Sequence, residues 1–525
     1  MLILALLLAG QDSSGAVLVD RDRIDRPAQR PTARDQAPKR GTVRVASEGA
    51  TTPIRGIRFQ GAKAPAPVAR AAQRFLGRTA SKETLAELAG SLSQAYARTD
   101  VALYTVAIPE QDFASGTVTV LLTEGRLAKA SVKDDRPGRH GLLRKRIAPM
   151  LGEAPLSRAT FERQVSLMKA IPGLTFETDF ADPGADGSLA LTVTPKQKRT
   201  RFSAGFSNRG IDLLGDGQFD ASAEFYGLAV DGDDLKVSAS AASDLKRYRY
   251  ASGTYALPLT ASGLTLTASA AWFETRPKGV PLRGTAKLAG VSLGYPVIRS
   301  FHRALDVSLG VDGIDSDNAA FGNLIASERT RAVRLGASFT EARDRRTVAL
   351  GGSLSKGLDV AGARVTAPLA ETGFLKANGS AFAEQRIGKP LFARVTLAGQ
   401  YTRDRLPAAE RFAVGGSAIG RAFDTGFLTA DRGVGVVGEL AVRPARKGPF
   451  ATSEVYGFAD RAWLGILGRG VPGRTDLAIA SAGVGARLRF KDKGEIGLEG
   501  ARAIDVPAYL TADGWRVSVS WRLSI

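Results

Sequence analysis

The chain has 525 residues, of which 44% are apolar and only 7% aromatic, with 59 glycines and no cysteine. The lack of cysteine excludes disulfide frameworks, cysteine-based zinc sites and thiol catalysis, and two histidines, His140 and His302, leave little room for imidazole chemistry. The net charge of +20 comes from basic residues dispersed along the whole chain, so it does not indicate nucleic-acid binding. Abundant glycine with few aromatic residues is typical of sheet-rich proteins.

The first fifty residues are expected to lie outside the folded body. Residues 1–16 open with an apolar run, Met1–Ala9, which is too short to span a membrane and has the length of a signal-peptide core. No basic residue precedes it, so we expect an atypical or truncated signal peptide, with the start of a buried helix as the alternative. Residues 17–50 are charged and broken by Pro27 and Pro31, which predicts an extended linker with a short helix as a candidate pore plug.

Residues 51–198 contain two consecutive copies of one small α/β plan. In the first copy, 51–126, helical spacing of Leu85, Leu88, Leu92 and Tyr96 predicts a helix with Ser81 or Thr79 as its cap. Strands are expected at 54–61, 103–108 and 117–122. The second copy, 127–198, predicts a strand at 127–132, helices near 142–151 and 161–170 with Ser157 as a cap, and strands near 174–178 and 188–194. Such repetition indicates a tandem array.

Residues 199–525 show segments of about ten residues in which every second residue is apolar, which is the pattern of a transmembrane β-barrel. The last segment is the clearest, since six apolar residues from Trp515 to Ile525 share one face and Arg516, Ser518 and Ser520 begin the other. We expect about eleven strands before residue 403 and about five after residue 432. The predicted fold is therefore mainly β, a sixteen-stranded barrel preceded by two α+β domains.

The stretch between the eleventh and twelfth expected strands, 403–432, is too long and too rich in glycine for an ordinary hairpin turn. No enzyme motif accompanies it: no nucleophile has a histidine in a plausible triad, and no phosphate-binding loop occurs. We therefore predict no catalytic residue, no metal site, no cofactor and no nucleotide.

The paired domains resemble the POTRA domains of two-partner secretion transporters, the hemolysin secretion/activation type. The residues that carry the resemblance include Pro109, Gln111, Phe113, Glu124 and Gly125. In that family these domains lie in the periplasm and capture an extended substrate, so the resemblance implies that these five residues take part in substrate capture.

The long loop resembles the family's in-folded loop, which carries a Val-Arg-Gly-Phe/Tyr tetrad after a Gly-Gly pair. This sequence keeps Gly415, Gly416, Arg421, Phe423, Asp424, Asp431, Arg432 and Gly433. It departs at Gly420, where the family has valine, and at Ala422, where it has glycine, so Gly420 is expected to supply the flexibility of the tip. The resemblance implies that Arg421 gates the lumen by pairing with Asp460 on the wall, with Glu439 on the strand that follows the loop.

Together these features predict an outer-membrane transporter of a Gram-negative bacterium that moves one secreted partner exoprotein, β-helical and in extended form, and activates it. Lipid and lipopolysaccharide of the outer membrane are expected around a monomeric barrel, with no nucleic-acid partner. Two alternatives remain: an assembly factor that inserts other barrels, which usually carries more POTRA domains, and a diffusion porin, which lacks this loop motif.

Overall fold

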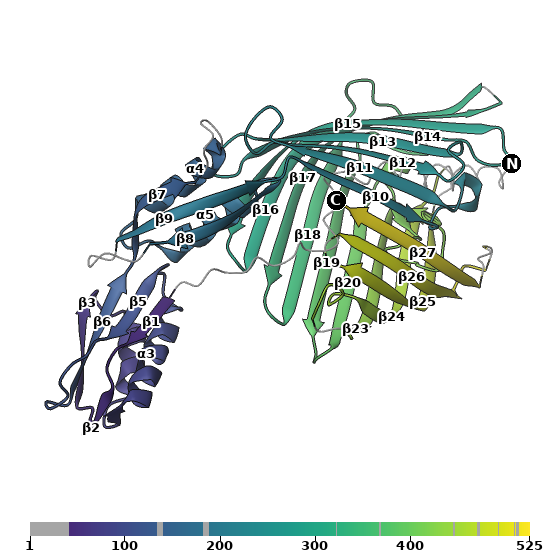
Figure 1. The fold of residues 1–525 in the computed structure, drawn as a ribbon. Coiled ribbons are helices and arrows are strands. Elements are labelled where there is room, and N and C mark those ends of the chain that lie inside the picture. Colours follow the sequence, from purple (N-terminus) through teal and green to yellow (C-terminus); the bar gives the residue numbers. More distant parts are fainter. Residues whose placement is uncertain are drawn as a thin grey trace. The chain divides into compact units, whose positions relative to one another are not determined.

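The computed structural model describes residues 41–133, 140–181, 188–321, 323–366, 369–444, 447–469, 473–491, 493–508, 510 and 514–525. The chain divides into two compact units, one of residues Asp35–Lys198 with Arg299–Phe301 and the other a barrel (Figure 1). The expected signal peptide and candidate plug helix fall in residues 1–40, which lie outside the described residues. No helix in the described ranges is long and apolar enough to cross a membrane.

The first module of the N-terminal unit is a four-stranded sheet, in the order β1-β5-β6-β3, covered by helices. Its elements are β1 (Gly41–Val45), β2 (Gly49–Pro53), β3 (Gly56–Gly61), α2 (Ala66–Gln73), β4 (Thr79–Ser81), α3 (Lys82–Tyr96), β5 (Tyr104–Ile108) and β6 (Thr117–Glu124). The hydroxyl of Ser81 accepts the N–H of Thr84 at 3.3 Å and caps α3, as the sequence predicted. Leu85, Leu88 and Leu92 are fully buried on the helix face that meets the sheet.

Two expectations for this module were wrong. Residues 41–50 were expected to be linker, but β1 pairs in parallel with β5, from Gly41 beside Tyr104 to Val45 beside Ile108. A parallel edge strand of five residues has no local signal, because its pairing partner lies about sixty residues further along the chain. Helix α2 was missed because Pro67 interrupts its first turn, where proline is in fact tolerated.

The second module has the predicted order of one strand, two helices and two strands. Its elements are β7 (Arg126–Val132), α4 (Gly141–Ile147), the 3₁₀ turn η2 (Ala148–Leu151), α5 (Arg158–Lys169), β8 (Leu174–Phe180) and β9 (Ser188–Gln197). Ser157 caps α5 by accepting the N–H of Thr160 at 3.2 Å. The sheet order is β7-β9-β8, so β8 is an edge strand that pairs only with β9 among the described strands.

The second unit is a closed barrel of sixteen strands, eleven before the long loop and five after it, as the sequence predicted. Neighbours in the sequence pair in antiparallel fashion, and β10 pairs with β27 to close the ring. The strands are β10 (Thr200–Ser207), β11 (Gln218–Tyr226), β12 (Asp234–Ala242), β13 (Tyr248–Pro258), β14 (Thr265–Thr275), β15 (Leu282–Arg299), β16 (Arg303–Ala320), β17 (Asn323–Ala342), β18 (Arg346–Gly357), β19 (Leu375–Arg386), β20 (Leu391–Thr402), β23 (Arg432–Val442), β24 (Glu454–Leu467), β25 (Arg474–Phe490), β26 (Gly494–Asp505) and β27 (Trp515–Ser524).

The outer face of the barrel is apolar, whereas the inner face carries the charged and polar side chains together with apolar clusters. On β27, Trp515 and Val517 are 65% and 61% exposed on the outer face, whereas Ser518 is buried on the inner face. An outer wall of exposed apolar side chains is stable only against hydrocarbon, and closure leaves no sheet edge unpaired there.

Candidate functional site

The segment between β20 and β23 folds back into the lumen as a hairpin of its own. A 3₁₀ turn, η4 (Ala408–Glu410), precedes β21 (Phe412–Val414), which pairs with β22 (Leu428–Ala430) in a two-stranded sheet separate from the barrel. The tip of this loop therefore comprises residues 415–427. The expected connection at 403–432 thus has internal structure that an ordinary turn lacks.

Apolar side chains fix the loop to the inner face of β23–β26. Val414, Ile419, Ala422 and Phe423 from the loop form one buried cluster with wall residues, which are Val437, Ala441, Tyr456, Phe458, Ala462, Leu464, Ile479 and Ala501. Phe423 is 2% exposed and stacks on Phe427, with ring centroids 4.9 Å apart. The loop is packed against this half of the lumen like a piece of core.

Glycines allow the tip its path. Gly415 has φ +103°, and a Cβ there would lie 2.0 Å from the carbonyl oxygen of Asp424, so only glycine fits. Gly420 has φ +77°, whereas Ala422 has no positive φ. A residue of positive φ therefore stands one position before Arg421, in agreement with the expectation that Gly420 supplies the flexibility of the tip.

Arg421 directs its guanidinium from the tip into the barrel wall. Its Nη1 lies 3.2 Å from Oε2 of Glu439 on β23 and 3.2 Å from Oε2 of Glu499 on β26. The guanidinium carbon lies 4.4 Å from the ring centroid of Phe458, in cation–π contact. A planar cation held by two carboxylates and an aromatic face fixes the orientation of the tip better than a lysine would.

Asp460 on β24 binds the backbone of the tip. Its Oδ1 accepts the N–H of Gly420 at 3.0 Å, its Oδ2 accepts the N–H of Arg421 at 3.2 Å, and the Ser481 hydroxyl donates to Oδ2 at 2.7 Å. The two residues lie together, as predicted, but the predicted ion pair was wrong. Asp460 binds the backbone N–H of Arg421 and not its guanidinium group. The backbone at the tip presents its N–H groups to β24, while the arginine side chain extends toward β23 and β26.

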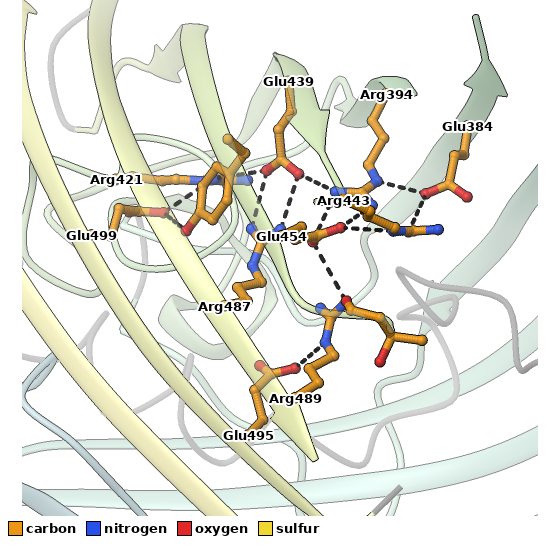
Figure 2. A network of polar contacts seen from close by, with 12 residues as sticks. Glu384, Arg394, Arg421, Glu439, Arg443, Glu454, Arg487, Arg489, Glu495 and Glu499 are labelled. Atoms are coloured by element: carbon orange, nitrogen blue, oxygen red, sulfur yellow. Dashed lines mark hydrogen bonds and ion pairs between the residues drawn. The ribbon is translucent and has the colours of Figure 1, made fainter. Parts of the chain in front are cut away.

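The Arg421 contacts belong to a larger ionic network on the inner wall (Figure 2). Glu439 also pairs with Arg394 of β20 and Arg487 of β25, and Glu454 pairs with the same two arginines. The network continues through Glu384, Arg443, Arg489 and Glu495. Removing a buried member, Arg394, Glu439, Glu454 or Arg487, leaves a charge without its partner and is costly, whereas Glu384 and Arg443 at the edge are partly exposed.

Two further carboxylates anchor the base of the loop. Glu410 is fully buried and pairs with Arg334 of β17 at 2.8 Å and Lys376 of β19 at 2.7 Å. Asp431 pairs with Arg469 at 2.7 Å and also accepts the N–H groups of Leu406 at 2.9 Å and Leu467 at 2.8 Å. The start and the end of the loop are thus held independently of its tip.

The far side of the tip reaches the strands that close the barrel. Asp424 pairs with Arg516 of β27, and the hydroxyl of Thr425 donates to the carbonyl of Arg209, just after β10, at 2.7 Å. Arg209 in turn donates to the Gly416 carbonyl at 3.4 Å and pairs with Glu499 at 2.5 Å. The loop contacts therefore extend from β23–β26 to the neighbouring β27 and to the end of β10.

Beside the loop the lumen keeps a cavity of about 830 Å³. Its walls come from β10–β12, β18–β20 and β27, with the loop residues Phe412, Ser417, Ala418 and Ile419 on the remaining side. Glycine, alanine and serine residues make up much of this wall. The cavity is lined by small residues and by charged side chains such as Arg201, Asp220 and Lys236, in contrast to the densely packed half that holds the loop.

Comparison with known proteins decides the family. A family model described as haemolysin secretion/activation protein ShlB/FhaC/HecB matches residues 187–488, which is more than half of the chain. The chain belongs to this family. It is thus a two-partner secretion transporter of the outer membrane, whose partner is a secreted exoprotein. A model described as a ShlB-type POTRA domain matches residues 52–125 of the transporter.

Solved structures share the fold of the whole transporter. CdiB from Escherichia coli has 18% sequence identity and a TM-score of 0.67, with 99% of this chain and 97% of that chain covered. CdiB from Acinetobacter baumannii has 16% identity and a TM-score of 0.62, with 99% of each chain covered. BamA from Haemophilus ducreyi, lacking POTRA domains 1–3, has 14% identity and a TM-score of 0.56, with 89% of this chain and 99% of that chain covered. No curated protein matches the sequence.

Several of the POTRA residues expected to capture substrate make contacts within their own domain. Phe113 is 5% exposed within the core of the first module, so it cannot contact a substrate. Gln111 is bonded through its amide to both backbone groups of Thr119, at 2.6 and 3.0 Å, and Pro109 contributes its carbonyl to the same amide. A Cβ on Gly125 would lie 2.9 Å from Leu103, and Glu124 accepts the hydroxyl of Tyr96. Burial therefore argues against substrate contact for Phe113 and Gly125, whereas capture by Pro109, Gln111 and Glu124 stays a prediction.

At the end of the loop motif, Arg432 and Gly433 begin β23. Arg432 falls on the outer face of the wall, in line with the exposed Val434 and Leu440, so it does not face the lumen. A Cβ on Gly433 would lie 2.8 Å from Leu464 and from Phe412, so this glycine lets the hairpin approach the wall. Of these two predicted gating residues, Gly433 thus lies against the hairpin residue Phe412.

Sequence reasoning missed most of the partners that the loop uses. Arg334, Lys376, Glu499, Arg469 and Arg516 were not singled out, although each binds the loop. A signal did exist for Glu499, Glu454, Arg394 and Arg487, because these charges occur at inward positions of the strands beside the loop. Charges at inward positions occur on many barrel strands, and only the arrangement of the strands selects these partners.

Proposed function

We propose that the loop formed by residues 403–432 is a clamp that occupies one half of the lumen and is displaced when the exoprotein passes. The observation that carries the proposal is the attachment of the loop at three separate carboxylate sites, Glu410, Asp460 and Asp431, beside a cavity of about 830 Å³. An ordinary loop needs no such set of buried charges.

The exoprotein would move along the other half of the lumen. Small side chains of β10–β12 and β18–β20 line the cavity there, and they would impose little sequence preference on an extended chain. The family relation supports an exoprotein that is extended in transit and folds outside as a β-helix, with activation coupled to its release. Passage then needs neither a nucleotide nor a catalytic residue, and the transporter works as a monomer surrounded by outer-membrane lipid and lipopolysaccharide.

The POTRA domains would lie in the periplasm and receive the exoprotein by strand addition. Edge strand β8 is the best candidate for this pairing, since its outer side has no partner among the described strands and four of its seven residues are exposed. We therefore place exoprotein capture at β8 and not at Phe113 or Gly125, because Phe113 is buried and Gly125 is tightly packed.

The test is a secretion assay with two variants of the inner wall. Arg421→Ala removes the cation that binds Glu439 and Glu499 at the tip, whereas Glu384→Gln alters the same ionic network without touching the loop. We expect Arg421→Ala to reduce exoprotein release and to increase the conductance of the empty barrel in lipid bilayers, while Glu384→Gln leaves both close to those of the unmodified protein. Folded insertion is checked for each variant by the mobility difference between heated and unheated protein. Unchanged release and conductance in inserted Arg421→Ala would contradict the clamp.

A further inference from the structure

The connection between β10 and β11, residues 208–217, is a compact lobe, named here the β10–β11 lobe. A 3₁₀ turn, η3 (Asp212–Leu214), lies at its centre. The N–H of Gly210 donates to the carbonyl of Asp216 at 2.9 Å and closes the neck of the lobe. A Cβ on Gly210 would lie 2.2 Å from the carbonyl oxygen of Gly215, so only glycine fits at this neck.

Apolar side chains hold the β10–β11 lobe against the inner wall of the barrel. Leu214 is 4% exposed and belongs to one buried cluster with wall residues of β12–β16, which are Ala242, Tyr248, Tyr250, Ala271, Phe273, Ala286, Leu288 and Ile314. Ile211 of the lobe and Ala409 of the loop base pack against the same cluster. The N–H of Lys278, between β14 and β15, donates to the carbonyl of Leu213 at 2.8 Å. The lobe therefore reaches across β11–β14 to a cluster that it shares with the base of the 403–432 loop.

The start of the β10–β11 lobe also binds both ends of the loop tip. Nη1 of Arg209 donates to the carbonyl of Gly416 at 3.4 Å, and the hydroxyl of Thr425 donates to the carbonyl of Arg209 at 2.7 Å. Arg209 pairs with Glu499, the carboxylate that also binds Arg421. The loop tip and the lobe thus hold each other in place from two sides.

The cavity of about 830 Å³ ends at the β10–β11 lobe. Its lining along β10 runs from Arg201, near the start of the strand, to Ser207 at its end, and Arg209 of the lobe continues it. Gln218, the first residue of β11, lines the same end. The chain enters β10 from the POTRA modules, so an exoprotein that follows the cavity from that end of the barrel meets the lobe at the other.

Both ends of the β10–β11 lobe are anchored, which leaves the residues between them as the part that can move. The side-chain oxygen of Asn208 accepts the N–H of Val519 on β27 at 2.7 Å. The carbonyl of Gly217 accepts the N–H of Ser243 at 2.8 Å. Between these anchors Gly215 has φ +94°, a conformation that glycine enters and leaves at little cost. Such positions near fixed ends are where a hinge absorbs its backbone change.

We propose that the β10–β11 lobe is a lid over the extracellular end of the cavity, which swings away to let the exoprotein out. The lid rests on the proposed passage of the exoprotein along the cavity and on the periplasmic position of the POTRA modules. It is a separate element from the clamp, since the lobe and the loop tip can be locked to the wall at different places. The lid can therefore fail while the clamp stands.

The test locks the β10–β11 lobe with a disulfide in a chain that has no cysteine of its own. A Cβ added at Gly215 would lie 3.2 Å from the Cβ of Ala242 on β12, close to the separation of about 3.5–4.5 Å in a disulfide, so the lock is Gly215→Cys with Ala242→Cys. The matched control is Gly217→Cys with Ser243→Cys. There the added Cβ would lie 3.3 Å from the Cβ of Ser243, but the bond joins the fixed ends of β11 and β12.

With oxidant, we expect the lock to abolish exoprotein release and a reductant to restore it, whereas the control pair releases exoprotein in both states. Undiminished release by the oxidised lock would overturn the lid. The pair Ala422→Cys with Ser481→Cys, which ties the loop tip to β25, separates the two proposals. Release by the oxidised lock together with a block by this tip pair would remove the lid and leave the clamp.

A second variant opens the β10–β11 lobe without a disulfide. Gly210→Ala places a methyl group against the Gly215 carbonyl and breaks the neck, whereas a Cβ at Gly253 on β13 would have no described atom within 4 Å, which makes Gly253→Ala the control. In lipid bilayers the empty barrel should open about tenfold more often with Gly210→Ala and as often as the unmodified protein with Gly253→Ala. Equal opening frequencies in the two variants would overturn the lid, and the gel-mobility difference of heated and unheated protein confirms that each variant is folded.

Discussion

Replacing Asp460 with asparagine is expected to release the loop tip from the barrel wall. In the structure its two carboxylate oxygens each accept one tip N–H, from Gly420 at 3.0 Å and from Arg421 at 3.2 Å, and Asp460 is only 5% exposed. An asparagine has one acceptor oxygen, so the second N–H would face an NH₂ group. Losing one buried bond to a charged acceptor and weakening the other costs about 3 kcal/mol, which raises the released fraction of the tip on the order of 100-fold.

The chain has no cysteine, so the position of the tip can be measured with engineered labels. Spin labels at Ser417→Cys on the tip and Thr396→Cys on β20 both face the cavity and report the distance across it. With Asp460 intact we expect one narrow distance distribution, and with Asp460→Asn a broad second population. Glu384→Gln, a wall carboxylate in the ionic network without loop contact, should keep the narrow distribution. Identical distance distributions in the unmodified protein and in the Asp460→Asn variant would refute the reasoning that this carboxylate holds the tip.

Three more perturbations follow from the same contacts. Arg421→Lys keeps the charge but cannot bridge Glu439 and Glu499 with one planar group. Exoprotein release should therefore fall between that of the unmodified protein and that of Arg421→Ala. Release equal to that of Arg421→Ala would show that the charge alone contributes nothing. The second perturbation is a cysteine pair, Ala422→Cys with Ser481→Cys, at a place where the Ala422 nitrogen lies 3.4 Å from the Ser481 hydroxyl. Under oxidising conditions the disulfide should block exoprotein release, and a reductant should restore it. Exoprotein release by the oxidised variant would contradict a moving clamp. Phe113→Ala should destabilise the first POTRA module by about 3–5 kcal/mol and make it sensitive to protease. Leu121→Ala, at a site that is 41% exposed, should change neither property. A protease-resistant Phe113→Ala variant with impaired exoprotein binding would show that Phe113 captures the exoprotein after all.

The sequence by itself determined the barrel, because that property is local. A strand turns successive side chains to opposite faces, so lipid outside and water inside impose alternation on each segment separately, as on β27 from Trp515 to Ser524. The caps of α3 and α5 by Ser81 and Ser157 were predictable for the same reason, since each cap binds a backbone N–H three residues away.

Only the tertiary structure decided what the loop holds. The partners of Arg421 are Glu439 and Glu499, 18 and 78 residues away, and they meet because strand order and tilt bring β23 and β26 to the place where the tip folds in. Asp460 was found from the sequence, but its role depends on the direction of two backbone N–H groups that Gly420 sets through its positive φ. The role of Phe113 also depends on the tertiary structure, which buries its side chain in the core of the first POTRA module. A motif tells which residue is present, whereas packing determines whether its side chain faces the core or the solvent.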